Sequence, residues 1–210
     1  MNLIAERRQE ERNRRRLEII HAAELAYSEK GWDALTVEHV ARQARLSRAL
    51  VYVYFQDRDD LHLAIVERSL EQLRRQMQSA ADAEPLGIEK VEAIARAYVD
   101  FAREVPHAFD ACSRFHARPS GERPASARLC ADAAASLLRV IASSIKTGVA
   151  DGSIRADLGA PALAALALWG FLHGMTQLSV NKADEIARTG IAIPQLLKYS
   201  FDMLRRTLAS

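Results

Sequence analysis

The chain has few of the residues that build disulfide frameworks, metal centres or catalytic motifs. Only two of its 210 residues are cysteines, Cys112 and Cys130, and they form no zinc-binding CxxC pair. Its six histidines do not occur at metal-ligand spacing, and no P-loop, GxSxG or paired-carboxylate motif is present. We therefore expect no enzyme, metal site or cofactor. The two thiols are either small buried hydrophobes, which is the favoured interpretation, or a redox pair.

Runs of alternating Val, Ile and Thr, which are typical of strands, are also missing. Ala, Leu, Arg and Glu dominate the composition, and this predicts an all-α chain. Its length suits one or two helical domains with a proper core. Because the N-terminus lacks the apolar run of a secretory signal, we expect a cytoplasmic protein.

One long stretch, residues 158–181, lacks charge altogether. Its length would span a bilayer. Proline, glycine, histidine and amide side chains within it make a poor spanning helix, so we expect no membrane contact. A helix that is apolar nearly all round instead belongs in a core or a subunit interface.

Three helices are predicted near the N-terminus. The first covers 17–30, where Leu17, Ile20, Ala23 and Tyr27 share one face, and Gly31 ends it. The second runs from 37 to about 44, and the third covers 48–54. Both begin after a residue suited to an N-cap, which indicates a helix-turn-helix corner.

The two caps are Thr36 and Ser47, and Leu46 at the corner is expected to fill the core. A full capping box would have Glu or Gln three residues after Thr36. His39 stands there instead, so only half of the box is expected.

The third helix carries more apolar side chains than its core needs. Val51 and Phe55 suffice for a buried face, which leaves aromatic and aliphatic surface exposed. A short helix held across a partner fits the major groove, with its N-terminal side chains at base edges. The candidate base-facing residues are Arg48, Ala49 and Leu50, and the candidate phosphate-facing residues are Tyr52 and Tyr54. A three-helix core in which the two tyrosines are merely packed remains the alternative.

Charge is distributed unevenly although the net charge is only +2. Residues 1–16 hold six arginines against three glutamates. Residues 36–58 also carry a small basic excess. Such runs are equally typical of a solvated face.

The stretch from Arg16 to about Leu73 resembles the DNA-binding domain of the tetracycline-repressor (TetR) family. The matching elements, in order, are Ala22-Ala23, Gly31, Thr36, Ala41 and Ala44 with Leu46-Ser47, Tyr52, Phe55, Arg58, Asp59-Asp60 and Leu61. Two departures are Arg45, where the family has Gly, and Ala49-Leu50, where it often has Gly and Thr. A left-handed Arg45 would cost about 1 kcal/mol and would project near the DNA.

The resemblance implies roles for individual residues. Phosphate contacts are expected from Thr36, Ser47, Tyr52, Tyr54 and Arg58, and base contacts from Arg48, Ala49 and Leu50. Residues 1–15 would form a basic arm that either reaches the neighbouring minor groove or stays a disordered tail. Residues 16–62 would form the DNA-binding domain, and residues 63–210 a helical effector-binding and dimerisation domain.

The remaining helices are expected over 91–104, 107–116 and 128–149 and in the last two segments, with a break at 82–89 and a loop at 117–126. By the resemblance, about 160–181 and 190–208 would form the homodimer interface. An aromatic stripe is more often core than ligand site, but it is also a candidate effector pocket for a small hydrophobic or aromatic molecule. The candidate residues are Tyr98, Phe101, Phe109, Phe115, Trp169, Leu172, His173 and Met175.

These observations together predict a ligand-responsive homodimeric transcriptional regulator. We expect a repressor that binds a near-palindromic operator with half-sites about one helical turn or a little more apart. The alternative is a helical module that binds protein through Tyr52 and Tyr54 and has no sequence-specific DNA affinity. The operator, the regulated genes and the effector do not follow from the sequence.

Overall fold

The computed structural model describes residues 3–115 and 125–210, and its regular elements are helices, which confirms the predicted all-α class. Within those residues the only extended pairing is a bridge between Ile154 and Ala209. The predicted loop at 117–126 lies outside the described residues up to position 124, as does the last residue of the helix predicted over 107–116. The helices are α1 (Leu3–Ala34), α2 (Val37–Gln43), α3 (Arg48–Tyr54), α4 (Arg58–Asp82), α5 (Gly87–Glu104), α6 (Pro106–Arg114), α7 (Ala125–Asp151), a 3-10 turn η1 (Ala156–Leu158), α8 (Pro161–Asn181), α9 (Ala183–Ala187) and α10 (Ile193–Leu208).

The chain forms two compact units. The N-terminal unit holds the described residues of 1–69 and 106–131, and the C-terminal unit holds 70–105 and 132–210. The division falls inside α4 and α7, so α6 belongs with the N-terminal helices. The boundary predicted between residues 62 and 63 remains a prediction.

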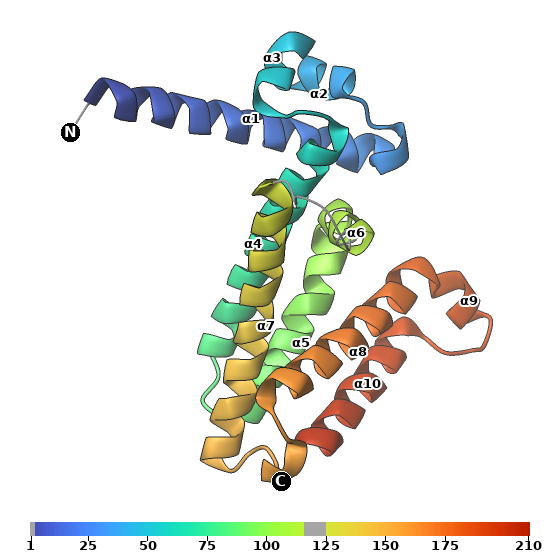
Figure 1. Ribbon diagram of the computed structural model, residues 1–210. Coiled ribbons are helices and arrows are strands. Elements are labelled where there is room, and N and C mark those ends of the chain that lie inside the picture. Colours follow the sequence, from blue (N-terminus) through green and yellow to red (C-terminus); the bar gives the residue numbers. More distant parts are fainter. Residues whose placement is uncertain (1–2, 116–124) are drawn as a thin grey trace. The chain divides into compact units, whose positions relative to one another are not determined.

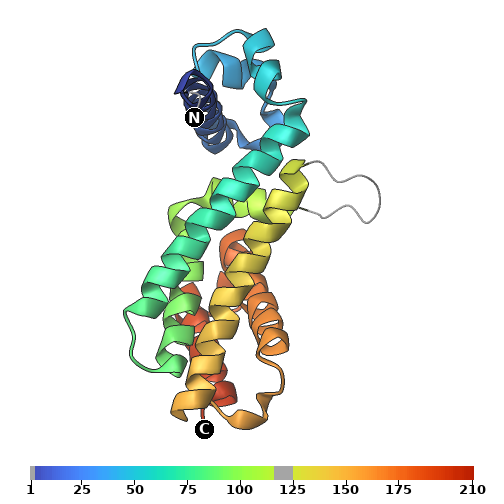
Figure 2. The same ribbon diagram turned by 60° about the vertical axis from the view of Figure 1, so that its left-hand side comes forward.

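The core of the N-terminal unit forms where α2 and α6 lie against α1, and α3 packs on α2 (Figures 1 and 2). Ile20, Ala23 and Tyr27 of the predicted α1 stripe are buried. Leu17 is not, because 51% of it is exposed, and Ile19 is fully buried in its place. The predicted core position at Leu17 was therefore wrong, since α1 has passed beyond its neighbours by that turn.

Helix α1 begins well before the predicted start at residue 17. It is continuous from Leu3, so the described residues of the basic arm are helical, and the alternative of a disordered tail does not describe them. Pairs of opposite charge one turn apart stabilise an exposed helix of this kind. Arg14 lies 2.7 Å from Glu11, and Arg15 lies 2.8 Å from Glu18. At the other end Gly31 leaves the helical conformation with φ 72°, where a helix stop was predicted.

The predicted caps form, and one is more complete than expected. The Thr36 hydroxyl accepts from the backbone N–H of His39 at 3.2 Å. The His39 Nδ1 atom in turn accepts from the N–H of Thr36 at 3.3 Å. The expectation of half a capping box was wrong, because an imidazole nitrogen supplies the acceptor that Glu or Gln usually supplies.

The corner between α2 and α3 is left-handed at Arg45, with φ 57°. The N–H of Leu46 closes the turn by donating to the carbonyl of Ala41 at 2.8 Å. The Ser47 hydroxyl then accepts from the N–H of Leu50 at 3.2 Å and caps α3. The Ser47 cap was predicted from the sequence, and the family resemblance pointed to the left-handed corner. Leu46, which was expected to fill the core, is only half-buried.

In the C-terminal unit α5 packs against α8 and α10, which lie side by side (Figures 1 and 2). Val91, Ile94 and Phe101 of α5 are fully buried. By length and composition alone, two helical stretches, Ser126–Asp151 and Pro161–Asn181, would suffice to cross a membrane. Core helices of other proteins pass the same test, so this observation is weak.

The backbones of α5 and α7 approach each other closely at Gly87, the first residue of α5. A Cβ atom there would lie 2.0 Å from the backbone nitrogen of Gly148 in α7. The same turn is tied to the end of α7, because the Gly87 N–H donates to the Asp151 carboxylate at 2.8 Å. Only glycine fits between these two backbones.

Replacing Gly87 with alanine should therefore be severely destabilising. We expect Gly87→Ala to lower the free energy of unfolding by about 3 kcal/mol or more, because backbone atoms must separate. Gly170→Ala in α8 is the matched control. Nothing lies within 4 Å of its added methyl group, and helix propensity should favour the change by about 1 kcal/mol. Urea unfolding measures both values, and similar effects of the two changes would contradict the close approach.

Candidate functional site

Helix α3 divides its apolar side chains between a buried and an exposed face. Val51 and Phe55 are buried, as predicted. Tyr52 is 46% exposed and Val53 is 63% exposed, so the surplus apolar surface reaches solvent. A three-helix core in which Tyr52 is merely packed does not describe this arrangement.

The exposed face of α3 continues with polar residues from the corner. Thr36, Arg45, Ser47, Arg48 and Ala49 are all exposed, whereas Leu50 and Tyr54 are half-buried. The hydroxyls of Thr36 and Ser47 accept backbone N–H groups as caps, but each still has its own hydrogen to donate. The predicted residues from 36 to 54 thus come from one α2–turn–α3 segment.

Arg48 is an exposed cation of this segment with a weak ion pair. Its guanidinium lies 3.9 Å from the Glu38 carboxylate, and both side chains are more than half exposed. A pair this exposed contributes little to stability. The arginine can therefore exchange the carboxylate for another acceptor at small cost.

Arg58 differs from the other predicted site residues because it is turned inward. Its Nη1 atom donates to the carbonyl of Leu35 at 3.2 Å. Its guanidinium carbon lies 4.4 Å from the centre of the Trp32 ring. Arg58 thus fastens the start of α4 to the connection between α1 and α2. A phosphate contact from this side chain stays a prediction, and the geometry favours a positioning role.

Trp32 and its neighbours form a polar and aromatic cluster that sequence reasoning missed. The Trp32 and His62 rings are 4.4 Å apart, and burial lowers the pKa of His62. The Tyr27 hydroxyl donates to the Asp110 carboxylate at 2.8 Å and so joins α1 to α6. These partners are 83 positions apart in the chain, and no local pattern signals such a pair.

The two cysteines lie in the same unit. The Cys130 thiol donates to the carbonyl of Leu63 at 3.1 Å, and burial raises the pKa of both thiols to about 12. At neutral pH both are protonated, which supports the favoured interpretation of inert thiols. In the part of the chain that the structure describes, no group of three or more His, Cys, Asp or Glu side chains is arranged to hold a metal.

The predicted effector residues do not all belong to one unit. Phe109 and Phe115 lie in the N-terminal unit, and the others lie on α5 and α8 of the C-terminal unit. The others are Tyr98, Phe101, Trp169, Leu172, His173 and Met175.

Two of these residues make a specific contact. The hydroxyl of Tyr98 is hydrogen-bonded to Nδ1 of His173 at 2.9 Å, and the Trp169 ring stacks on the imidazole with centroids 5.5 Å apart. Burial lowers the pKa of His173, which favours the neutral imidazole. One turn further along α8, Thr176 is fully buried, and its hydroxyl has no hydrogen-bond partner among the described residues. Sequence reasoning missed Thr176, although its spacing from His173 places both on one helix face.

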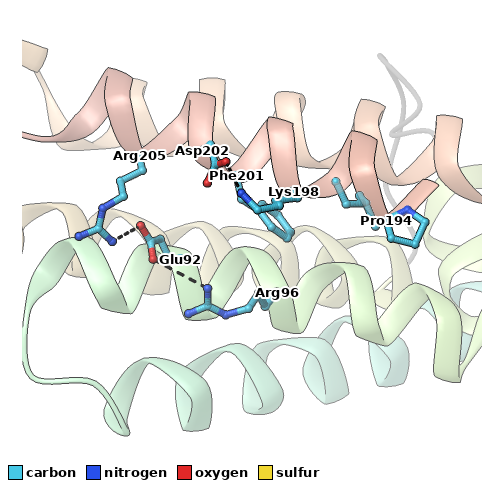
Figure 3. Close-up of a pocket in the computed structure, with 8 residues that line it drawn as sticks. Glu92, Arg96, Pro194, Lys198, Phe201, Asp202 and Arg205 are labelled. Carbon is cyan, nitrogen blue, oxygen red and sulfur yellow. Dashed lines mark hydrogen bonds and ion pairs between the residues drawn. The ribbon is translucent and has the colours of Figure 1, made fainter. Parts of the chain in front are cut away.

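Two hollows of the C-terminal unit lie beside α10. A hollow of about 520 Å³ between α8 and α10 is mostly apolar. A second hollow lies between α5 and α10 (Figure 3), and the charged side chains that line it form ion pairs with one another. There Glu92 pairs with Arg205 at 2.5 Å and with Arg96 at 3.8 Å, and Lys198 pairs with Asp202 at 2.8 Å. No predicted effector residue is among the described residues that line either hollow.

Two family models match the chain. Residues 19–65 match the model for bacterial regulatory proteins of the tetR family, and residues 91–188 match a tetracyclin repressor-like C-terminal domain. The chain belongs to the TetR family. It is a helix-turn-helix transcriptional regulator, and regulators of this family are DNA-binding proteins rather than enzymes.

Similarity to curated TetR-family relatives is confined to one part of the chain. The match to the regulator HbdR of Aromatoleum sp. (strain CIB) is 45% identical over 47 residues, 22% of this chain and 20% of that protein. The match to the uncharacterized regulator YfiR of Bacillus subtilis (strain 168) is 29% identical over 73 residues, 35% of this chain and 36% of that protein. The matches thus span about a third or less of these relatives.

Solved structures with this fold match nearly the whole chain. A protein of unknown function from Rhodococcus sp. RHA1 has a TM-score of 0.74 at 22% identity, covering 93% of this chain and 95% of that one. FadR of Bacillus subtilis, in complex with stearoyl-CoA, has a TM-score of 0.70 at 16% identity, covering 91% and 98%. AibR, in complex with isovaleryl coenzyme A and operator DNA, has a TM-score of 0.65 at 16% identity, covering 90% and 97%. At these identities the likeness establishes the fold alone.

The inward geometry of Arg58 leads to a prediction about salt dependence. Arg58→Ala should weaken DNA binding for all sequences while leaving the slope of log K against log salt unchanged, because no phosphate contact is lost. A lost phosphate contact would reduce that slope by about 0.9. Arg75→Ala, an exposed arginine on the same helix, removes the same charge and should affect neither quantity. Anisotropy titrations over a salt series decide, and a slope reduced by about one would assign Arg58 to a phosphate.

Proposed function

We propose that this TetR-family regulator is a homodimeric repressor that binds a near-palindromic operator and is released by a hydrophobic or aromatic small molecule. The observation that carries the proposal is the exposed face of α3. Its aromatic and aliphatic side chains reach solvent beside an adaptable arginine, while two capped helix starts and a left-handed corner fix the helix across α2. We expect the protein to work in the cytoplasm.

Helix α3 has the dimensions and side chains to read the major groove. Arg48 can donate two hydrogen bonds to the O6 and N7 atoms of guanine, and Ala49 and Leu50 can pack on thymine methyl groups. The hydroxyls of Thr36, Ser47 and Tyr52 can donate to phosphates, which sets position but carries no sequence information. Arg45 projects from the corner beside them. Leu50 and Tyr54 are half-buried, so their contribution is smaller than that of their neighbours.

The proposed dimer interface consists of the exposed apolar side chains of α8 and α10. Leu163 is 69% exposed, Tyr199 is 67% exposed, and Leu166 and Met203 are also exposed. A contiguous apolar surface beside an apolar hollow marks an interaction site in a soluble protein. A second copy is the proposed occupant because a two-fold interface pairs the same patch on both subunits, as a palindromic operator requires.

The interior of the C-terminal unit offers the effector an apolar setting with few polar groups. Tyr98 and His173 already bind one another, and the buried Thr176 hydroxyl still lacks a partner. Ligand sites commonly combine apolar walls with a few placed polar groups of this kind. FadR and AibR, which share the fold, are complexed with acyl-coenzyme A molecules, so acyl thioesters are the first candidates. Such a ligand releases DNA only as far as it prefers the state that does not bind DNA.

Selection of bound sequences from a random duplex library tests DNA recognition directly. We expect an enriched inverted repeat from the unmodified protein. Arg48→Ala should weaken binding to that repeat by about 1–3 kcal/mol and relax one base position in each half-site. Tyr52→Phe should weaken binding to all sequences alike, because it removes a phosphate donor.

The outcomes of the selection separate the proposal from its rival. Enrichment of nothing, with affinity lost at moderate salt, would leave only phosphate attraction and favour a protein-interaction module. An enriched single half-site would overturn the dimer. Equal effects of Arg48→Ala and Tyr52→Phe on every sequence would overturn the division of roles within α3.

Replacing Thr176 tests its effects on stability and on ligand response separately, because its buried hydroxyl has no hydrogen-bond partner among the described residues. Thr176→Val should raise the free energy of unfolding by about 1 kcal/mol, because a buried hydroxyl without a partner is removed. If that hydroxyl binds the effector, the same variant should need more stearoyl-CoA or isovaleryl-CoA to release DNA. Thr147→Val, whose hydroxyl donates to the carbonyl of Ser143, is the control and should leave the response unchanged. Unfolding and DNA-release titrations measure the two effects, and a stabilised variant with normal release would exclude Thr176 from the ligand site.

A further inference from the structure

The first turns of α1, residues 3–16, form an exposed helical arm. It continues past the part of α1 that packs against α2 and α3 (Figure 1). At 1.5 Å per residue the arm is about 20 Å long. Leu3 to Arg14 are exposed throughout, so the arm adds no core to the chain.

The arginines of the arm are sorted by face. At 3.6 residues per turn, Arg8, Arg12, Arg15 and Arg16 lie on the side of α1 that continues into buried Ile19 and Ala23. We call these four residues the arginine face. Arg7 and Arg14 lie on the other side of the helix, as do Glu6 and Glu10.

One contact fixes the direction of the arginine face. The guanidinium carbon of Arg16 lies 5.3 Å from the centre of the Phe55 ring, and Phe55 is the C-cap of α3. The arm therefore leaves the module beside the C-terminal end of the proposed reading helix. Its arginine face points to the same side as the helices that α1 covers.

We propose that the arginine face contacts DNA phosphates that flank each operator half-site. This inference rests on the proposed insertion of α3 into the major groove. It assigns to the arm a sequence-independent share of the affinity, in addition to that of the proposed phosphate donors Thr36, Ser47 and Tyr52.

Groove dimensions bring the phosphates within reach of the arm. The major groove is about 8.5 Å deep, so a helix that reads its floor has phosphate ridges rising beside it by about that depth. At Arg16 the arm lies within that distance of α3, because the guanidinium carbon of Arg16 is 5.3 Å from the centre of the ring of Phe55, the C-cap of α3. When α3 lies in the groove, the flanking ridge thus rises toward α1, where the arginine face projects.

The helical state of the arm argues against insertion of its backbone into the minor groove, which was one of the two alternatives that the sequence left open. An α-helix with its side chains is about 10–12 Å across, whereas the minor groove is about 6 Å wide. Arg8 and Arg12 are one turn apart on the helix, about 6 Å along its axis, and can each meet a phosphate of the backbone. Such contacts attract every DNA sequence equally.

A pair of double variants tests the proposal. Arg8→Ala with Arg12→Ala removes two positive charges from the arginine face. Arg7→Ala with Arg14→Ala removes the same charge from the other side of the same helix. Alanine preserves helicity, which circular dichroism checks. The probe is the enriched operator duplex, with or without one helical turn of flanking DNA, about 10 base pairs, at each end.

On the flanked duplex the Arg8/Arg12 variant should reduce the slope of log K against log salt by about 1.8 per subunit, because two phosphate contacts are lost. On the trimmed duplex it should behave like the unmodified protein. The Arg7/Arg14 variant should match the unmodified protein on both. The order of preference among operator sequences should not change in any variant.

Equal slopes for the two double variants on flanked DNA would overturn the proposal, since only overall charge would then matter. Slopes unchanged in both variants would also overturn it and would favour an acidic protein surface as the partner of the arm. If the unmodified protein enriches no operator, the proposed function fails instead, and the two failures are distinguishable.

Discussion

The left-handed residue at the corner between α2 and α3 is the constraint on which the rest of the N-terminal unit depends. Arg45 turns the backbone with φ 57°, so that Leu46 can close onto Ala41 and Ser47 can cap α3. Glycine would adopt this conformation without strain, whereas arginine costs about 1 kcal/mol. Arginine at this position instead places a charged side chain beside the helix proposed to read DNA. The corner thus gives up stability at a position where charge is proposed to serve DNA binding.

Each of the two units leaves apolar side chains exposed, and a two-fold symmetric dimer on DNA would account for both exposed patches. A single chain leaves Tyr52 and Val53 exposed on α3, and Leu163 and Tyr199 exposed on α8 and α10. The first patch is rimmed by hydroxyls and an arginine, which suits a polyanion with apolar base methyl groups. The second borders an apolar hollow, which suits another protein surface. A two-fold pairing through the second patch would present two copies of the first, and a palindromic operator is the DNA that matches them.

Local signals in the sequence predicted the reading helix well because capping and turn chemistry involve neighbouring residues. Gly31, Thr36, Ser47 and the buried pair Val51 and Phe55 follow from such signals, whereas the left-handed corner at Arg45 was expected only from the family resemblance. The helical arm, the exposure of Leu17 and the completed capping box at His39 did not follow from periodicity alone. Arg58 and Thr176 depend on which distant residues meet them, and a single sequence does not contain that information. The roles of site residues in binding remain predictions for the same reason.

The distribution of charge would assign overall affinity for DNA and discrimination among DNA sequences to different surfaces of the protein. The net charge of the chain is only +2, and the Arg48 guanidinium lies 3.9 Å from the Glu38 carboxylate. The surface proposed to read DNA is therefore only weakly basic. Nonspecific attraction to DNA comes from neutralised phosphates, however, and needs a concentrated set of cations. The arginine face supplies such a set outside the base-reading surface. The protein would then bind DNA tightly enough to search it, while the choice among sequences stays with the few side chains of α3 that reach base edges.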